Sequence, residues 1–312
     1  MKTKIVVGTR GSKLALIQTE SVVSKLKLMH PELEISIKKI VTAGDRDRLT
    51  HLDRIGVDVF VKELEEALLD GRIDFAVHSL KDVPTLRGDE EIIVAAISKR
   101  DSPLEALVSK DNVPFKMLPK GAIIGTSSLR RMTQIKFLRP DLKIKPIRGN
   151  VDTRIQKVKR GELHAVILAY AGLDRLGLND MVTEVFPPEV MVPAAGQGAL
   201  AVMIRRDRSD LLDVLERIDH FPTRAEVTAE RSLIAAIEGG CHFPIGAYAH
   251  AESGRLTLYG CIFSVDALRK IEVRVEGDLN EAEDLGRKAA HMLMAKGADE
   301  IRAQWREKYG LW

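Results

Sequence analysis

The feature that most constrains the fold of this chain is an internal repeat. Residues 5–9, Ile-Val-Val-Gly-Thr, are predicted to form a buried strand that ends at a glycine and leads into a helix. Residues 122–126, Ala-Ile-Ile-Gly-Thr, repeat that order and are followed by a second helical pattern. Strands that alternate with helices in this way predict two similar α/β domains.

A second pair of similar segments supports the internal repeat. Residues 64–77 have the pattern of a helix, a glycine stop and an apolar strand, and residues 157–168 have the same layout. The apolar run 201–204 is predicted to return to the first domain as a further strand. After residue 222 a helix, alternating strand-like segments and a C-terminal helix from Glu281 predict a small α+β domain.

These patterns divide the 312 residues into three predicted domains. Residues 1–98 with 200–218 form the first α/β domain, and residues 102–194 form the second. Residues 222–312 form the α+β domain. The polar segment 98–103 and the Pro- and Gly-containing segment 193–198 are the predicted crossovers.

Composition narrows the function classes. Hydrophobic residues make up 45% and charged residues 30%, which is the balance of a soluble globular protein, and the apolar runs are too short to span a bilayer. The net charge of +3 disfavours a nucleic-acid-binding protein. The N-terminus does not have the pattern of a secretory signal, so a cytoplasmic location is expected. CxxC and HExxH spacings are not present, and we expect no metal site.

The two repeated junctions are candidate anion-binding sites. A helix N-terminus exposes unpaired N–H groups, and hydroxyl and guanidinium groups beside it would complete a carboxylate or phosphate site. The alternative is that the hydroxyls only cap the helices. The first junction offers Arg10 and Ser12, and the second offers Thr126, Ser127, Ser128, Arg130 and Arg131.

Three further arginines follow predicted strands. Arg148 comes just after one strand, Arg154 lies in the first turns of the next helix, and Arg175 follows the strand 165–168. Each alone would be an ordinary solvated side chain. Ligands of open α/β sheets bind beyond the carboxyl ends of the strands, so the set favours a polyanionic ligand.

Asp82 follows the apolar strand 75–77 and stands between Lys81 and a proline turn. A carboxylate in this position can stabilise a developing cation or move a proton, although it can also simply cap the turn.

The two cysteines have different contexts. Cys261 lies in a strand pattern and is expected to be an inert core thiol. Cys241 follows a helix and two glycines, which suits a nucleophile or an attachment point. A thiol hydrolase that pairs Cys241 with His242 is disfavoured, because adjacent residues rarely reach nucleophile–base geometry. A non-catalytic anion-binding protein would explain the arginines but would leave Cys241 and Asp82 without a role.

Together these segments resemble the porphobilinogen deaminase (hydroxymethylbilane synthase) family. The motifs that carry the resemblance run in family order across nearly the whole chain: Gly8-Thr9-Arg10 to Ala15, Ala76 to Pro84, Gly125 to Arg131, Arg148 to Arg154, Ala194 to Ala199, and Glu238-Gly239-Gly240-Cys241.

The resemblance implies two domains like those of type II periplasmic binding proteins, followed by an α+β domain. It implies a dipyrromethane cofactor, built from two substrate molecules and joined to Cys241 by a thioether. The implied reaction condenses four porphobilinogen molecules head to tail into hydroxymethylbilane, with loss of ammonia. A monomer is expected, with no nucleic-acid or membrane partner.

The resemblance also assigns roles to residues. Asp82 would assist ammonia loss, stabilise the cationic azafulvene intermediate and help remove the α-proton. The cofactor contacts would be Lys81, Asp82, Thr126, Ser127, Arg130 and Arg131. The contacts to carboxylates of the substrate or growing chain would be Arg10, Ser12, Gln18, Arg148, Arg154 and Arg175.

Two departures from the family pattern stand out. His242 and Phe243 follow Cys241, where the family usually has Gln or Ser and then Val. Val57 and Asp58 replace an expected lysine and glycine. The polar segment 43–59 that contains them is expected to be a mobile lid.

Overall fold

The computed structural model describes residues 4–41, 61–85, 91–238 and 243–309. These residues group into two compact units. Unit 1 consists of residues 1–101 and 198–224, and unit 2 consists of residues 102–197 and 225–312. Because the second and third expected domains fall together in unit 2, the three-domain boundaries stay a prediction.

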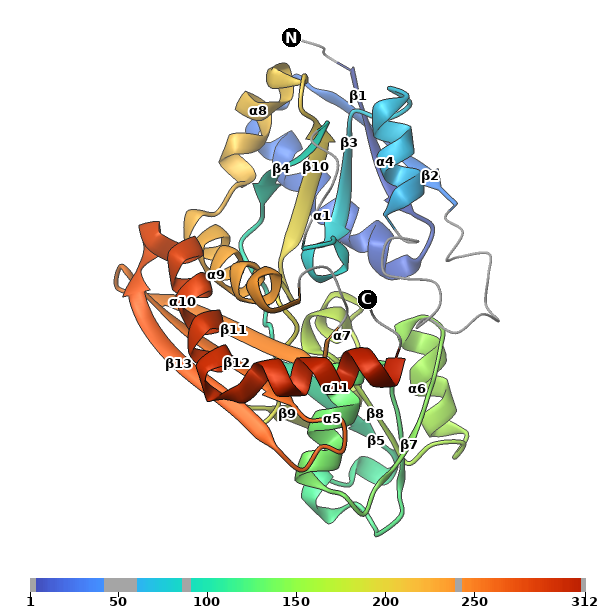
Figure 1. Ribbon diagram of the computed structural model, residues 1–312. Coiled ribbons are helices and arrows are strands. Elements are labelled where there is room, and N and C mark those ends of the chain that lie inside the picture. The colour runs from blue at the N-terminus through green and yellow to red at the C-terminus, as the bar shows by residue number, and fades with distance from the viewer. Residues whose placement is uncertain (1–3, 42–60, 86–90, 239–242, 310–312) are drawn as a thin grey trace. The chain divides into compact units, whose positions relative to one another are not determined.

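Unit 1 is built on a five-stranded mixed sheet (Figure 1). Its strands, in spatial order, are β2 (Glu34–Ile40), β1 (Lys4–Arg10), β3 (Phe75–Ser79), β10 (Leu200–Arg205) and β4 (Ile92–Ile97). Strand β1 runs parallel to β2 and β3, whereas β10 runs antiparallel to β3 and β4. The strand predicted at 201–204 therefore does return to the first sheet.

Unit 2 contains a second five-stranded sheet with the same plan. Its strands, in spatial order, are β7 (Lys143–Lys145), β6 (Ile123–Gly125), β8 (Ala165–Ala169), β5 (Glu105–Ser109) and β9 (Glu184–Phe186). Strand β6 is parallel to β7 and β8, and β5 is antiparallel to β8 and β9. The order and directions match those of the first sheet, so the predicted repeat of two α/β folds is confirmed.

Two of the helices that follow the repeated strands also correspond. In unit 1 these are α1 (Lys13–Met29) and α4 (Lys62–Leu69), and in unit 2 they are α5 (Leu129–Leu138) and α6 (Val151–Lys159). Helix α7 (Tyr170–Arg175) follows β8, whereas the equivalent strand β3 is followed by a 3₁₀ turn, and α8 (Ser209–Leu215) follows β10. Helices α4 and α6 both end before a glycine with positive φ, Gly71 at 67° and Gly161 at 74°. Glycine adopts this left-handed conformation without a Cβ penalty, which explains the shared helix–glycine–strand signature.

A glycine near the end of each repeated strand lies against closely packed side chains. A Cβ on Gly125 would lie 2.6 Å from Leu163 Cδ1 and 2.9 Å from Ile147 Cδ1. A Cβ on Gly8 would collide in the same way with the side chains of Ile73 and Leu64. The repeat therefore encodes close packing beneath each junction, where any side chain would push the neighbouring residues out of place.

The rest of unit 2 is an antiparallel sheet covered by helices. The helix α9 (Phe221–Glu238) precedes three strands in sequential order, β11 (Ile245–Glu252), β12 (Arg255–Phe263) and β13 (Lys270–Asp278). They are followed by α10 (Ala282–Leu293), a π-helical turn at residues 294–298, and α11 (Asp299–Tyr309). This is the small α+β arrangement predicted for the C-terminal part.

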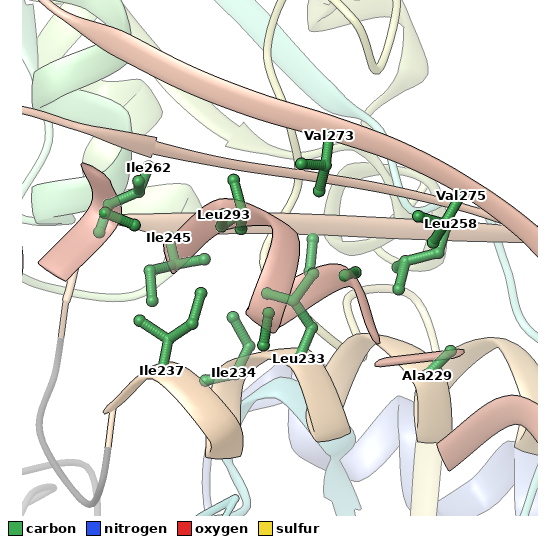
Figure 2. Close-up of a cluster of buried hydrophobic side chains, with 14 of the residues drawn as sticks. Ala229, Leu233, Ile234, Ile237, Ile245, Leu258, Ile262, Val273, Val275 and Leu293 are labelled. Atoms are coloured by element: carbon green, nitrogen blue, oxygen red, sulfur yellow. The ribbon is translucent and has the colours of Figure 1, made fainter. Parts of the chain in front are cut away.

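The core of this C-terminal part lies between the helices and the sheet. Figure 2 shows Leu233 and Ile237 of α9 pointing toward Ile245 and Leu258 of the strands, with Leu293 of α10 beside them. All five side chains are buried. Burying each such side chain is worth about 1.5–3 kcal/mol, so this cluster is the main support of the fold around the end of α9.

None of the helices within the described ranges is both long and apolar enough to cross a membrane.

Candidate functional site

The first junction lies at the carboxyl end of β1. Arg10 is the last residue of the strand, and the buried Thr9 donates its hydroxyl hydrogen to Ala15 O over 3.1 Å. Ser12 is the N-cap of α1, and its Oγ accepts a hydrogen bond from Ala15 N at 3.2 Å. The capping role that we left open is therefore present at Ser12.

Gln18 connects this junction to the neighbouring strand. It is 5% exposed, and its Nε2 donates to Ser79 Oγ at 2.9 Å. Ser79 is the last residue of β3, which pairs in parallel with β1, so the carboxyl ends of both strands meet at one edge of the sheet. The structure thus brings Arg10, Ser12 and Gln18 to the edge that continues into residues 80–82.

Asp82 lies in a one-turn 3₁₀ helix, η2 (Leu80–Asp82), immediately beyond β3 rather than at the strand end itself. The buried Leu80 anchors the turn, since its N–H donates to Ala199 O at 3.0 Å. Its carbonyl accepts from Val83 N at 3.0 Å. Lys81 and Asp82 are half-buried in this turn. The anchored turn holds the Asp82 backbone in place and leaves its carboxylate partly accessible.

The hydroxyl groups of the second junction make hydrogen bonds to the backbone. Thr126 Oγ1 accepts from Ser128 N at 3.2 Å, and Ser128 is the N-cap of α5. Ser127 Oγ donates to Ile147 O at 2.6 Å and accepts from Ile147 N at 3.0 Å, which joins the end of β6 to the segment after β7. The helix-capping interpretation has support here as well, and the cofactor contacts predicted for Thr126 and Ser127 stay a prediction.

Three arginines follow the parallel strands of the second sheet. Arg148 lies three residues after β7, and Arg154 lies in the first turn of α6, where its Nε donates to Gly149 O at 2.8 Å. Arg175 is the last residue of α7, so a helix separates it from the end of β8. Because β7, β6 and β8 are parallel neighbours, their carboxyl ends lie at the same sheet edge.

Arg130 and Arg131 lie in the first turn of α5 and are almost fully buried, at 7% and 6% exposed. Both bind Glu105, the first residue of β5, which is 0% exposed. Arg130 Nη2 donates to Glu105 Oε1 at 2.5 Å, and Arg131 Nη2 donates to Glu105 Oε2 at 2.7 Å. The predicted site residues thus have an unexpected partner.

Glu105 was not identified from the sequence. The available signal was a carboxylate at the head of the apolar run 106–108, because a charge in a buried strand requires a partner of opposite charge. Burial lowers the pKa of the Arg130 guanidinium, and the Glu105 charge opposes that shift. The carboxylate therefore helps to keep a buried guanidinium charged.

The two cysteines stand differently in the structure. Cys241 and His242 lie outside the described residues, as does the whole segment 43–59 with Val57 and Asp58. Cys261 is 0% exposed on β12, and burial raises the pKa of its thiol to about 12. A buried thiol that stays protonated is a poor nucleophile, so the prediction of an inert core cysteine is confirmed.

These features define a class. Two equivalent α/β sheets each present a helix N-terminus and arginines at the carboxyl ends of parallel strands. Among the described residues, no group of His, Cys, Asp and Glu is arranged to hold a metal ion. This arrangement is typical of an α/β protein that binds a ligand with several carboxylates or phosphates.

Comparisons of the chain with known proteins name the family. Residues 5–213 match the family model "Porphobilinogen deaminase, dipyromethane cofactor binding domain", and residues 224–295 match "Porphobilinogen deaminase, C-terminal domain". The chain therefore belongs to the porphobilinogen deaminase family. Membership makes it a transferase of porphyrin biosynthesis with a dipyrromethane cofactor.

Curated porphobilinogen deaminases are similar to this chain over nearly its full length. The chain is 45% identical to the porphobilinogen deaminase of Desulforamulus reducens, with 96% of this chain and 97% of the relative covered. It is 45% identical to the porphobilinogen deaminase of Brevibacillus brevis, with 96% of each covered. It is 40% identical to the probable porphobilinogen deaminase of Nitrosopumilus maritimus, with 99% of each covered.

Solved structures similar to this chain include periplasmic binding proteins. A TRAP periplasmic solute binding protein from Desulfovibrio salexigens matches with a TM-score of 0.42 and 10% identity, covering 70% of this chain and 73% of that protein. The aliphatic sulphonate binding protein SsuA from Escherichia coli matches with a TM-score of 0.40 and 12% identity, covering 76% and 71%.

The described residues fit a dipyrromethane group. Each of its two pyrroles carries an acetate and a propionate, so the group brings four carboxylates. The Arg130–Glu105–Arg131 cluster has one more positive than negative charge and lies beside the N-terminus of α5. Such a site attracts a carboxylate both by charge and by N–H donors.

Proposed function

We propose that this chain condenses four porphobilinogen molecules head to tail into hydroxymethylbilane and releases one ammonia per molecule. One water molecule detaches the product from the cofactor and supplies its hydroxyl group. Its dipyrromethane would be joined to Cys241 by a thioether, and the protein would act as a cytoplasmic monomer. The observation that carries the proposal is the placement of arginines at the carboxyl ends of parallel strands in two equivalent sheets, since every added pyrrole brings two carboxylates.

Asp82 is the proposed catalytic residue. When the substrate loses ammonia, the C–N bonding electrons leave with the nitrogen and the pyrrole becomes cationic. The Asp82 carboxylate stabilises that charge by accepting a hydrogen bond from the pyrrole N–H. It then helps to take up the proton that the α-carbon loses when the new carbon–carbon bond forms. The anchored turn supports this role because it holds the Asp82 backbone in place before the substrate binds.

When bound, the dipyrromethane supplies the free pyrrole α-carbon to which each new substrate is joined. The chain's residues hold and orient its carboxylates. The proposed cofactor contacts are Lys81, Asp82, Thr126, Ser127, Arg130 and Arg131. The proposed contacts to substrate and growing-chain carboxylates are Arg10, Ser12, Gln18, Arg148, Arg154 and Arg175. Charge-assisted hydrogen bonds of this kind contribute about 1.5–3 kcal/mol each.

The attachment can be tested by intact-mass measurement of denatured protein made in cells that synthesise porphyrins. We expect the wild-type chain to carry the mass of two porphobilinogen molecules less two ammonia molecules. Cys241→Ser should lose this adduct. Cys261→Ala is the matched control, because its thiol is buried, and it should keep the adduct.

An unmodified wild-type chain would contradict the proposal. It would leave the non-catalytic anion-binding protein as the better interpretation. An adduct that persists in Cys241→Ser would keep the activity but remove Cys241 as the anchor.

A further inference from the structure

The single carboxylate of Glu105 accepts hydrogen bonds from two arginines, Arg130 and Arg131. Its Oε1 accepts from Arg130 Nη2 at 2.5 Å. Its Oε2 accepts twice from Arg131, from Nε at 3.1 Å and from Nη2 at 2.7 Å. Three charge-assisted hydrogen bonds therefore fix the two guanidinium planes relative to each other.

The strand that carries Glu105 is held firmly. Glu105 lies opposite Ala169 of β8 and Phe186 of β9, so it is paired on both sides of its strand. Just before it, Pro103 O accepts a hydrogen bond from the buried Gln197 Nε2 at 2.7 Å. A carboxylate on such a strand has little freedom to move, and it can act as a fixed reference point for the arginines.

The helix that carries the arginines is held independently. Gln134, one turn after Arg130 on α5, is 0% exposed and bonds to both the N–H and the C=O of Val192. Arg130 Nη1 donates to the same Val192 carbonyl at 2.6 Å. The arginine backbone and the Glu105 backbone are thus fixed by separate contacts, and the ion pairs join two rigid elements.

The charges of the cluster have a clear consequence. Two adjacent buried guanidinium groups would repel each other and would be costly to desolvate without a counter-charge. Glu105 supplies one negative charge and leaves a net charge of +1. The cluster is therefore stable in the folded protein and still attracts an anion.

The hydrogen-bond donors of the two arginines are unequally used. Both terminal nitrogens of Arg130 donate to protein, one to Val192 O and one to Glu105. Arg131 uses Nε and Nη2 for Glu105, and within the described ranges its Nη1 makes no hydrogen bond to protein. Among the four terminal nitrogens of the two arginines, Arg131 Nη1 is thus the one that the described protein groups leave for a ligand.

We propose that Glu105 is a positioning residue of the cofactor site, which holds Arg130 and Arg131 in one arrangement so that Arg131 Nη1 can donate to a ligand carboxylate. This inference rests on the proposed function, which assigns both arginines to the dipyrromethane. Glu105 itself touches no ligand and acts through the arginines.

The direct test measures how fast the adduct forms. Full-length apoprotein would be made in a host that lacks porphobilinogen, then mixed with porphobilinogen, and the covalent mass would be followed over time. In Glu105→Gln we expect the rate to fall on the order of tenfold or more, the scale on which buried charge pairs act. Glu105→Asp keeps the charge and should recover most of the rate.

Glu230→Gln is the matched control. Glu230 is also 0% exposed, and it accepts hydrogen bonds from the backbone nitrogens of Gly196 and Ala249 at 2.7 and 2.8 Å. It should lose stability in urea denaturation but form the adduct at close to the wild-type rate. If Glu105→Gln forms the adduct as fast as Glu230→Gln, the inference is wrong.

A second measurement does not need the Glu105→Gln protein, in case that variant does not fold, and is made in the Cys241→Ser background. Two-dimensional NMR of the arginine Nε–H groups, with the Arg131 signal assigned by its loss in Arg131→Lys, reports the order of that side chain. We expect Arg131 Nε to be as rigid as the backbone before any cofactor binds. Fast motion there would overturn the inference.

The two levels of failure are distinguishable. If wild-type apoprotein gains no covalent mass from porphobilinogen, the proposed function fails. If it gains the mass but either Glu105→Gln forms the adduct at the control rate or the Arg131 Nε–H group moves fast, only the role of Glu105 fails.

Discussion

The side-chain amide of Gln134 makes two hydrogen bonds to the backbone of Val192, one through its oxygen and one through its nitrogen. Oε1 accepts from Val192 N at 2.7 Å, and Nε2 donates to Val192 O at 3.0 Å. Both residues are 0% exposed. The pair ties the helix of the two buried arginines to the segment that leads out of β9.

Gln134→Leu should therefore destabilise the protein. Leucine has a similar volume but leaves the buried Val192 N–H without its acceptor, which costs about 1–3 kcal/mol. The free energy of unfolding from urea denaturation would measure the loss. Gln156→Leu, at an exposed position of α6, is the control and should change it little. Equal effects of the two substitutions would mean that the Val192 contact is not important.

Cys261 predicts a specific dependence of stability on pH. Burial raises the pKa of its thiol from 9.0 to about 12. Between these values the unfolded chain loses the proton while the folded chain keeps it, so the folded state binds more protons and stability falls as pH rises. The slope from this one group is at most about 1.4 kcal/mol per pH unit.

Cys261→Ala removes this contribution, and its stability curve should be flatter than that of the wild type above pH 9.0, where the thiol begins to titrate in the unfolded chain. Both proteins would be compared by urea denaturation in the Cys241→Ser background, which leaves Cys261 as the only thiol. Parallel curves would show that the thiol titrates at the same pH in both states.

The repeat could be predicted because its cause is local. Gly8 and Gly125 each lie near the end of an apolar strand, where a Cβ would meet neighbouring side chains. A hydroxyl-capped helix follows each of them within a few residues, so the pattern can be found in a short stretch of sequence. The left-handed glycines Gly71 and Gly161 left an equally local signature. From such local features the alternation of helices and strands, and hence the α/β class, could be predicted.

The partners of the site residues could not be predicted in the same way. Glu105 reaches Arg130 only because β5 lies next to β8, and that register depends on contacts between distant segments. Gln134 was not identified from the sequence, and it is fully buried. Sequence spacing therefore located the arginines, whereas the groups that fix them depend on tertiary pairing.

Phe243 is a departure from the family pattern whose role the sequence left open. In the structure it is 6% exposed and belongs to the core of the C-terminal sheet, with the Arg306 guanidinium carbon 6.0 Å from its ring centroid. Phe243→Ala should cost about 3–5 kcal/mol of unfolding free energy, because it opens a cavity in that core. The exposed Phe221 is the control, and Phe221→Ala should have a small effect. Differential scanning calorimetry would compare the two, and similar losses would exclude a core role for Phe243.

Asp82→Glu separates the catalytic role from cofactor attachment. Glutamate keeps the charge but moves the carboxylate by one methylene from the position that the η2 turn defines. We expect the adduct to be present by intact mass and turnover of porphobilinogen to fall on the order of 10²-fold, the lower range for a positioned acid–base group. Asp180→Glu makes the same change at an exposed position of another 3₁₀ turn, η5 (Asn179–Met181), and should turn over normally. Near-normal turnover of Asp82→Glu would remove Asp82 from its proposed role, because a carboxylate that tolerates such a displacement is not aligned with the reacting pyrrole.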